Sequence, residues 1–196
     1  MKILFAIVSV FLSGALSAQV ISHGDFQMVV PFLQQEDFKG AFEKTNQLLT
    51  TTKNDSSDVR GIVTYMNIFS AAGMVTLDQM TFEDFQTNAN KYIGHRLVMP
   101  AHPCIDSTAL GYNTLKFVMH NGLLKGMTTT ANKSKSTILC FEYFVYAEPV
   151  NPSQLLGRTV RCGGILESVE INPNKSKIWI SRLHIRNAFA RPMGKK

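Results

Sequence analysis

The sequence predicts an α+β fold in which an N-terminal helical hairpin precedes a small closed β-barrel of five strands. Before residue 90, apolar side chains recur every three to four residues, which is typical of helices that bury one face. After residue 90, runs rich in β-branched and aromatic residues alternate with period two, which is typical of strands. The charge changes at the same point: residues 19–90 carry four basic and nine acidic side chains, whereas residues 91–196 carry fifteen basic and five acidic ones.

The first 18 residues have the composition of a secretory signal peptide. Lys2 is followed by the apolar run 3–12 and then by small residues up to Ala18. This run is shorter than the roughly 20 apolar residues that a membrane-spanning helix needs. We therefore expect cleavage after Ser17 or Ala18 and an exported protein, periplasmic or secreted, with no transmembrane segment.

Residues 19–90 are predicted to form an acidic helical region. One helix begins near Glu36, and a second carries apolar side chains on one face from Val59 onward. Thr81 and Asp84 have the spacing of a capping box at the start of a third helix. The first two helices form a hairpin, and a single hairpin cannot bury its own apolar face. It must therefore pack on the rest of the chain or on a partner protein.

Residues 91–190 are predicted to form the basic barrel, and residues 191–196 a basic tail. The expected strands are residues 95–99, 115–119, 137–147, 159–171 and 177–185. Five strands in about 100 residues suit a small closed barrel.

Three segments of this region resemble parts of an OB-fold. Residues 88–98 resemble its lead-in helix and first strand, residues 155–166 its fourth strand, and residues 178–188 its closing strand. The stretch from residue 88 to residue 188 is similar to the anticodon-binding-like OB domains of small exported bacterial proteins. The resemblance implies a barrel that binds extended ligands on its second and third strands and that pairs its first strand with its fourth.

The same resemblance bears on the three cysteines. It implies that the end of the first strand lies beside the start of the fourth, which makes Cys104 and Cys162 a candidate disulfide in an oxidising compartment. Cys140 would then be a buried free thiol. The alternative is three half-buried cysteines that form no bridge.

No motif in the sequence points to catalysis. The five histidines are scattered without a metal-binding pair, and the chain has no nucleophile elbow, phosphate-binding glycine loop or dinucleotide fingerprint. We therefore predict that the protein is not an enzyme and that it uses no metal and no cofactor.

Basic and aromatic residues are interleaved along the barrel region. Grooves for single strands combine cations for the phosphates with rings for stacking. The candidate ligand-binding residues are Lys116, Tyr143, Arg158, Arg161, Lys177, Trp179 and Arg182. The alternative is that the rings belong to the core and that the cations only keep an exported domain soluble.

The expected function is that of an exported, non-catalytic binding protein. The hairpin favours a protein-interaction module of the bacterial envelope or secreted fraction, because it can dock on a partner protein. The opposite charges of the two regions favour the alternative, a binder of an anionic polymer such as single-stranded nucleic acid or an acidic glycan. The same charges would also arise if the helices dock on the barrel of their own chain.

Overall fold

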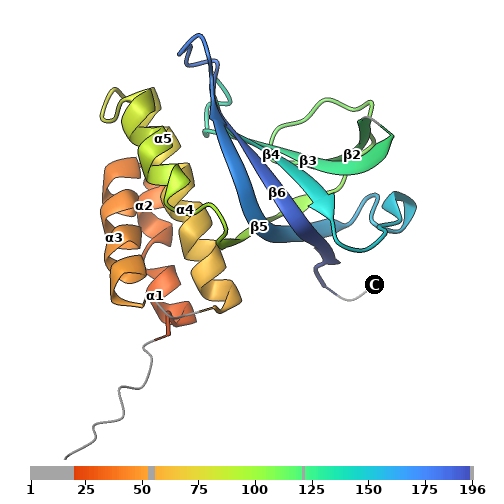
Figure 1. Cartoon of the computed structure of the whole chain (residues 1–196), viewed down its shortest axis with the longest axis horizontal. Helices are drawn as coiled ribbons and strands as arrows, with labels where there is room; N and C mark the ends of the chain where they lie inside the picture. Colours follow the sequence, from red (N-terminus) through yellow and green to blue (C-terminus); the bar gives the residue numbers. More distant parts are fainter. Residues whose placement is uncertain (1–19, 53–55, 121, 195–196) are drawn as a thin grey trace, which may run out of the picture.

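The computed structural model describes residues 20–52, 56–120 and 122–194, so the predicted signal peptide lies outside the described residues. The helices are α1 (His23–Gln27), α2 (Val30–Gln35), α3 (Phe38–Thr51), α4 (Asp58–Thr76) and α5 (Phe82–Asn90). The strands are β1 (Arg96–Pro103), β2 (Leu115–His120), β3 (Leu123–Ala131), β4 (Ile138–Tyr146), β5 (Thr159–Ile171) and β6 (Trp179–Pro192). Figure 1 shows the helices gathered on one side of the molecule and the strands on the other.

The strands form one open sheet, so the predicted closed five-stranded barrel is wrong. The strand order is β1-β5-β6-β4-β3-β2, which leaves β1 and β2 as the edges. All neighbouring strands are antiparallel except β4 and β6, which run parallel. One bridge between Cys104 and Leu115 links the ends of the edge strands, and no further ladder joins them in the described residues. Helix α4 packs against β1 instead.

The sixth strand, β3, is the element that the sequence reading missed. Residues 123–131 were not among the expected strands, yet the preceding Asn-Gly dipeptide is a strong hairpin signal. His120 pairs with Leu123 across the turn, where Gly122 has a φ of 74°. Gly126 leaves room for Tyr146 of β4, because a Cβ atom at this position would collide with the Tyr146 hydroxyl. The strands β2 and β3 therefore form a tight hairpin.

The predicted pairing of the first strand with strand 159–171 is confirmed as the β1–β5 pair. Leu97 lies opposite Gly164, and the register shifts between Val98 and Ala101. This irregularity contains Pro100, which has no N–H group to give to a ladder. Gly163 is required for the close approach of the two strands, because a Cβ atom there would lie 2.6 Å from the Leu97 carbonyl oxygen.

The predicted hairpin of helices is confirmed as α3 and α4. The predicted start of a helix at Thr81 is also confirmed, since the Thr81 hydroxyl caps α5 by accepting a hydrogen bond of 3.0 Å from the Asp84 backbone N–H. The sequence reading did not anticipate α1 and α2, which are only 5 and 6 residues long. Ser22 and Asp25 form a full capping box that starts α1.

The helical hairpin finds its packing partner in the sheet of its own chain. Buried side chains of α4, including Ile68, share one core with strand residues such as Leu183. Four ion pairs join acidic residues of the helical region to basic residues of β1, β6 or the β5–β6 turn: Asp58–Arg96, Asp58–Arg191, Asp78–Lys177 and Glu83–Lys175. Part of the charge asymmetry therefore serves docking within the molecule. No helix in the described ranges is long and apolar enough to cross a membrane.

Candidate ligand-binding face

The two faces of the sheet differ in their environment because successive side chains of a strand point to opposite sides. In β4, Cys140, Glu142 and Phe144 are fully buried, and the Glu142 carboxylate meets Tyr65 of α4. We call this side the inner face. Phe141 and Tyr143 point to the opposite side, where they are only half-buried. We call this side the outer face.

A cluster of rings and charges covers the outer face where β4, β6 and β5 adjoin. This Trp179 cluster consists of Phe141, Tyr143, Glu170, Trp179, Arg182 and His184. The Arg182 guanidinium lies 4.5 Å from the centroid of the Trp179 ring, and the Tyr143 and His184 rings stack with centroids 5.5 Å apart. The Glu170 carboxylate lies 3.7 Å from Arg182 Nη1 and 3.1 Å from His184 Nε2. The cluster thus holds a carboxylate against a guanidinium that rests on an aromatic ring.

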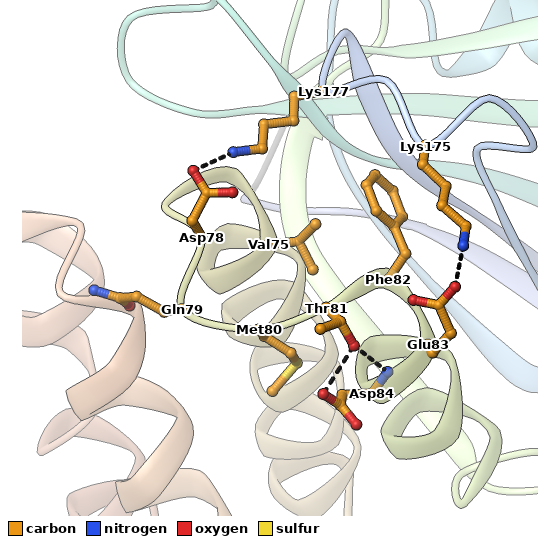
Figure 2. Close-up of a pocket in the computed structure, with 10 residues that line it drawn as sticks. All are labelled: Val75, Asp78, Gln79, Met80, Thr81, Phe82, Glu83, Asp84, Lys175 and Lys177. Carbon is orange, nitrogen blue, oxygen red and sulfur yellow. Dashed lines mark hydrogen bonds and ion pairs between the residues drawn. The ribbon is translucent and has the colours of Figure 1, made fainter.

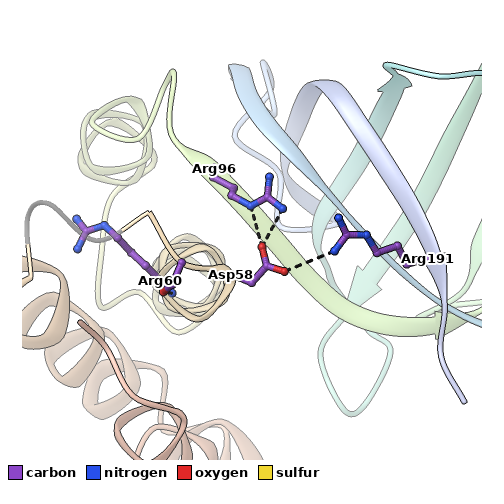
Figure 3. A network of polar contacts seen from close by, with 5 residues as sticks. Asp58, Arg60, Arg96 and Arg191 are labelled. Atoms are coloured by element: carbon purple, nitrogen blue, oxygen red, sulfur yellow. Dashed lines mark hydrogen bonds and ion pairs between the residues drawn. The ribbon is translucent and has the colours of Figure 1, made fainter.

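A second cluster repeats this arrangement nearer the β1 edge. In this Phe189 cluster, the Arg96 and Arg191 guanidinium carbons lie 5.1 and 4.4 Å from the Phe189 ring centroid. Both guanidinium groups approach the carboxylate of Asp58 at the start of α4 (Figure 3). Here the bound carboxylate belongs to the helical region rather than to the sheet.

A row of cations crosses the outer face beside the two clusters. Lys125 lies opposite Val145, and Arg186 lies opposite Ile165, which in turn lies opposite Arg96. Neighbouring strands are about 4.8 Å apart, so cations on every second strand are spaced by about 10 Å. Lys125 and Arg186 form no ion pair within the described part of the chain. Two cations of this row are therefore available to an anion from outside.

The structure brings three of the seven predicted ligand-binding residues together, namely Tyr143, Trp179 and Arg182 in the Trp179 cluster. Arg161 shares the outer face of β5, opposite Arg191 of β6. The Nε atoms of Arg161 and Arg182 are buried, and neither has a hydrogen-bond partner among the described residues.

The other three predicted residues lie elsewhere. Lys116 faces outward on β2 and donates a hydrogen bond to the Ala109 carbonyl oxygen. Arg158 stands just before β5, outside both clusters. Lys177 also precedes its strand and pairs with Asp78 at 2.7 Å.

Lys177 belongs to a hollow of about 450 Å³ between the α4–α5 turn and the β5–β6 turn (Figure 2). Lys175 at the same hollow pairs with Glu83. Each lysine that lines the hollow is therefore already paired with a carboxylate of the helical region. Among the described residues that line the hollow, no unpaired cation is left to bind an external anion.

The sequence analysis did not include seven members of the clusters among its candidate residues: Asp58, Arg96, Phe141, Glu170, His184, Phe189 and Arg191. His184 had a usable signal, because it alternates with Arg182 and Arg186 along one strand. Asp58 and Arg96 are separated by 38 positions of sequence, and no local pattern predicts such a pair.

The inner face contains a fully buried acid, Glu142, with no cation beside it. Its carboxylate accepts hydrogen bonds from the hydroxyl groups of Tyr65 at 2.6 Å, Thr128 at 2.5 Å and Thr130 at 3.2 Å. Burial raises the pKa of Glu142 to about 7, although these three hydroxyl groups lower it. The cluster fastens α4 to β3 and β4, and it is closed to ligands from the solvent.

All three cysteines are free, buried thiols, so the candidate disulfide between Cys104 and Cys162 is absent from the structure. The Cys104 N–H donates a hydrogen bond to the carbonyl oxygen of Arg158. Cys104 therefore lies beside a residue that comes four positions before Cys162 in the chain. Burial raises the pKa of the Cys162 thiol to about 12, and it raises that of Cys140 as well. These thiols are poor nucleophiles, since reactivity requires the thiolate.

Within the described ranges, no group of three or more histidine, cysteine or acidic side chains could hold a metal ion. A comparison of the chain with protein-family models, curated proteins and solved structures finds no match.

Proposed function

We propose that this is an exported protein that binds an acidic glycan, a polymer bearing carboxylates, through the outer face of its sheet. The observation that carries the proposal is the repeated arrangement of the Trp179 and Phe189 clusters. In each of them, an arginine rests on an aromatic ring and is directed at a carboxylate. Arg186 lies between the two clusters along β6, and Lys125 extends the positive surface to β3.

This arrangement suits carboxylates for a physical reason. A guanidinium group presents a rigid fork of donors that matches the two oxygens of a carboxylate. Stacking on a ring holds the fork in place, so less side-chain entropy is lost when an anion binds. A repeating acidic polymer would satisfy several such positions at once.

The rings themselves are poorly placed for single-stranded nucleic acid. Base stacking requires ring faces that are open to the ligand. Tyr143 is stacked on His184, and Trp179 is covered on one side by Arg182. The rings thus support the cations, which favours a ligand recognised by its charges.

The case for a protein-interaction module rested on a helical hairpin in need of a partner. In the structure this hairpin packs on its own sheet, and its residue Asp58 pairs with Arg96 of β1 and Arg191 of β6. The hairpin therefore gives no further reason to expect a partner protein.

A salt titration tests the proposal. We expect fluorescein-labelled polygalacturonate fragments to bind the mature protein, with affinity falling about tenfold or more between about 50 and 200 mM salt, as for roughly three released counterions. Labelled oligothymidine should bind more weakly, and neutral dextran should not bind. Salt-independent retention of polygalacturonate, or tighter binding of oligothymidine, would contradict the proposal.

A further inference from the structure

We infer that the Phe189 cluster is a carboxylate subsite of this face and that Asp58 of the same chain fills it, in competition with the ligand. The inference rests on the proposed function and deepens it, because it assigns one subsite, the chemistry of its occupant and an internal competitor. The cluster faces outward on β1 and β6, beside the row of cations that includes Arg186.

The contacts of Asp58 are those expected for a bound carboxylate. Its Oδ1 atom accepts a hydrogen bond of 2.9 Å from Arg96 Nε and lies 2.8 Å from Arg96 Nη2. Its Oδ2 atom lies 3.7 Å from Arg191 Nη1. Two guanidinium groups that share one aromatic ring thus converge on one carboxyl group (Figure 3).

The same contacts are open to exchange. The side chains of Arg96, Asp58 and Arg191 are 34%, 50% and 63% exposed, so solvent and ligand can reach the site. Ion pairs with this exposure are individually weak. A polymer whose other acidic groups are already held nearby would present its carboxylate at a high effective concentration and displace Asp58.

Asp58 is not the residue that caps α4, so capping does not explain its contacts with the two arginines. The helix α4 is capped by Ser57, whose hydroxyl accepts a hydrogen bond of 3.2 Å from the Arg60 N–H. Asp58 lies in the first turn, where its charge adds a favourable but screened interaction with the helix dipole. The side chain can therefore be changed to asparagine with little effect on the helix.

Asp78 provides a matched control. It also belongs to the helical region and pairs with one strand-side cation, Lys177, but it does so at the hollow between the two turns (Figure 2). Its φ is 56°, a left-handed conformation that asparagine adopts readily. Asp58→Asn and Asp78→Asn thus remove the same charge, and only the first opens the Phe189 cluster.

The test compares the affinity of four proteins for labelled polygalacturonate: the wild type, Asp58→Asn, Asp78→Asn and the double variant Asp58→Asn/Arg191→Gln. We expect Asp58→Asn to bind about threefold more tightly than the wild type, as for a subsite that is free about a third of the time. Asp78→Asn should show a much smaller gain, and adding Arg191→Gln to Asp58→Asn should remove the gain. Circular dichroism confirms folding, and Asp58→Ser replaces Asp58→Asn if that variant does not fold.

Two results would overturn the inference, and they can be told apart. Equal affinities of the Asp58→Asn and Asp78→Asn proteins, with clear binding by the wild type, would reject the internal competitor and leave the proposed function standing. The absence of binding by all of the proteins would reject both.

Discussion

Replacing Glu142 with glutamine is expected to raise the free energy of unfolding at about pH 8 by about 3 kcal/mol. The carboxyl group is fully buried, and burial raises its pKa to about 7 from an ordinary value of 4.5. The folded protein therefore binds more protons than the unfolded chain between these two pH values. The contribution of Glu142 to stability is therefore largest below pH 4.5, falls as the pH rises, and reaches its lower level above pH 7.

The titratable groups around Glu142 do not compensate its charge. Tyr65, Cys140 and Cys162 are buried, and burial raises the pKa of each of them, so all three are neutral when Glu142 ionises. A glutamine side chain reproduces the protonated acid. Its oxygen can accept from the Tyr65 hydroxyl, and its amide can donate to the hydroxyl groups of Thr128 and Thr130.

Urea unfolding between about pH 4 and pH 8 measures this effect. The free energy of unfolding of Glu142→Gln minus that of the wild type should be near zero at the acid end and should reach its full value at about pH 8. This difference cancels the titration of groups that both proteins share, such as His102, whose pKa is lowered by burial. The control is Glu148→Gln, which changes an exposed acid just after β4 and should leave the wild-type pH dependence intact. A Glu142→Gln protein less stable than the wild type at about pH 8 would contradict the account of the buried cluster.

Removing the two unpaired cations of the outer face should weaken binding strongly. The double variant Lys125→Gln/Arg186→Gln is expected to lose about tenfold in affinity for polygalacturonate at low salt, along with part of its salt dependence. Neither side chain forms an ion pair in the described structure, so the variant should unfold at nearly the same urea concentration as the wild type. Fluorescence anisotropy measures the affinity.

The matched control removes two cations from the helical side. Lys39 on α3 and Lys91 at the end of α5 are both exposed. The variant Lys39→Gln/Lys91→Gln has the same net charge as the first pair but leaves the outer face intact. An equal loss of affinity in both double variants would show that binding follows net charge and not the outer face.

The periodicities of the sequence predict most elements of the fold, but they do not predict whether the edge strands of the sheet pair to close a barrel. The hairpin of α3 and α4 follows from the helical periodicity, and the β1–β5 pair was implied by the resemblance to an OB-fold. The closed barrel was wrong because β1 and β2 remain the edges of the sheet and because β3 adds a sixth strand between β2 and β4. Alternation along a strand does not reveal which neighbour the strand has, and β1 packs against α4.

The candidate site shows the same division. The interleaved cations and rings predicted Tyr143, Trp179 and Arg182, which one register brings together on β4 and β6. Lys177 lies outside this cluster, because that residue precedes β6 and pairs with Asp78. The position of Asp58 against Arg96 depends on how α4 docks on β1, which is a property of tertiary packing.

The location of the bound polymer tests the central claim most directly. Proton–nitrogen correlation spectra of the mature protein, recorded during a titration with polygalacturonate, report on each backbone amide and on the Trp179 indole. We expect the largest shifts for the indole and for residues 182–186 of β6, with smaller ones along β3 and β5. Shifts confined to the turns around Asp78 and Lys175, or no shifts at all, would contradict a ligand-binding outer face.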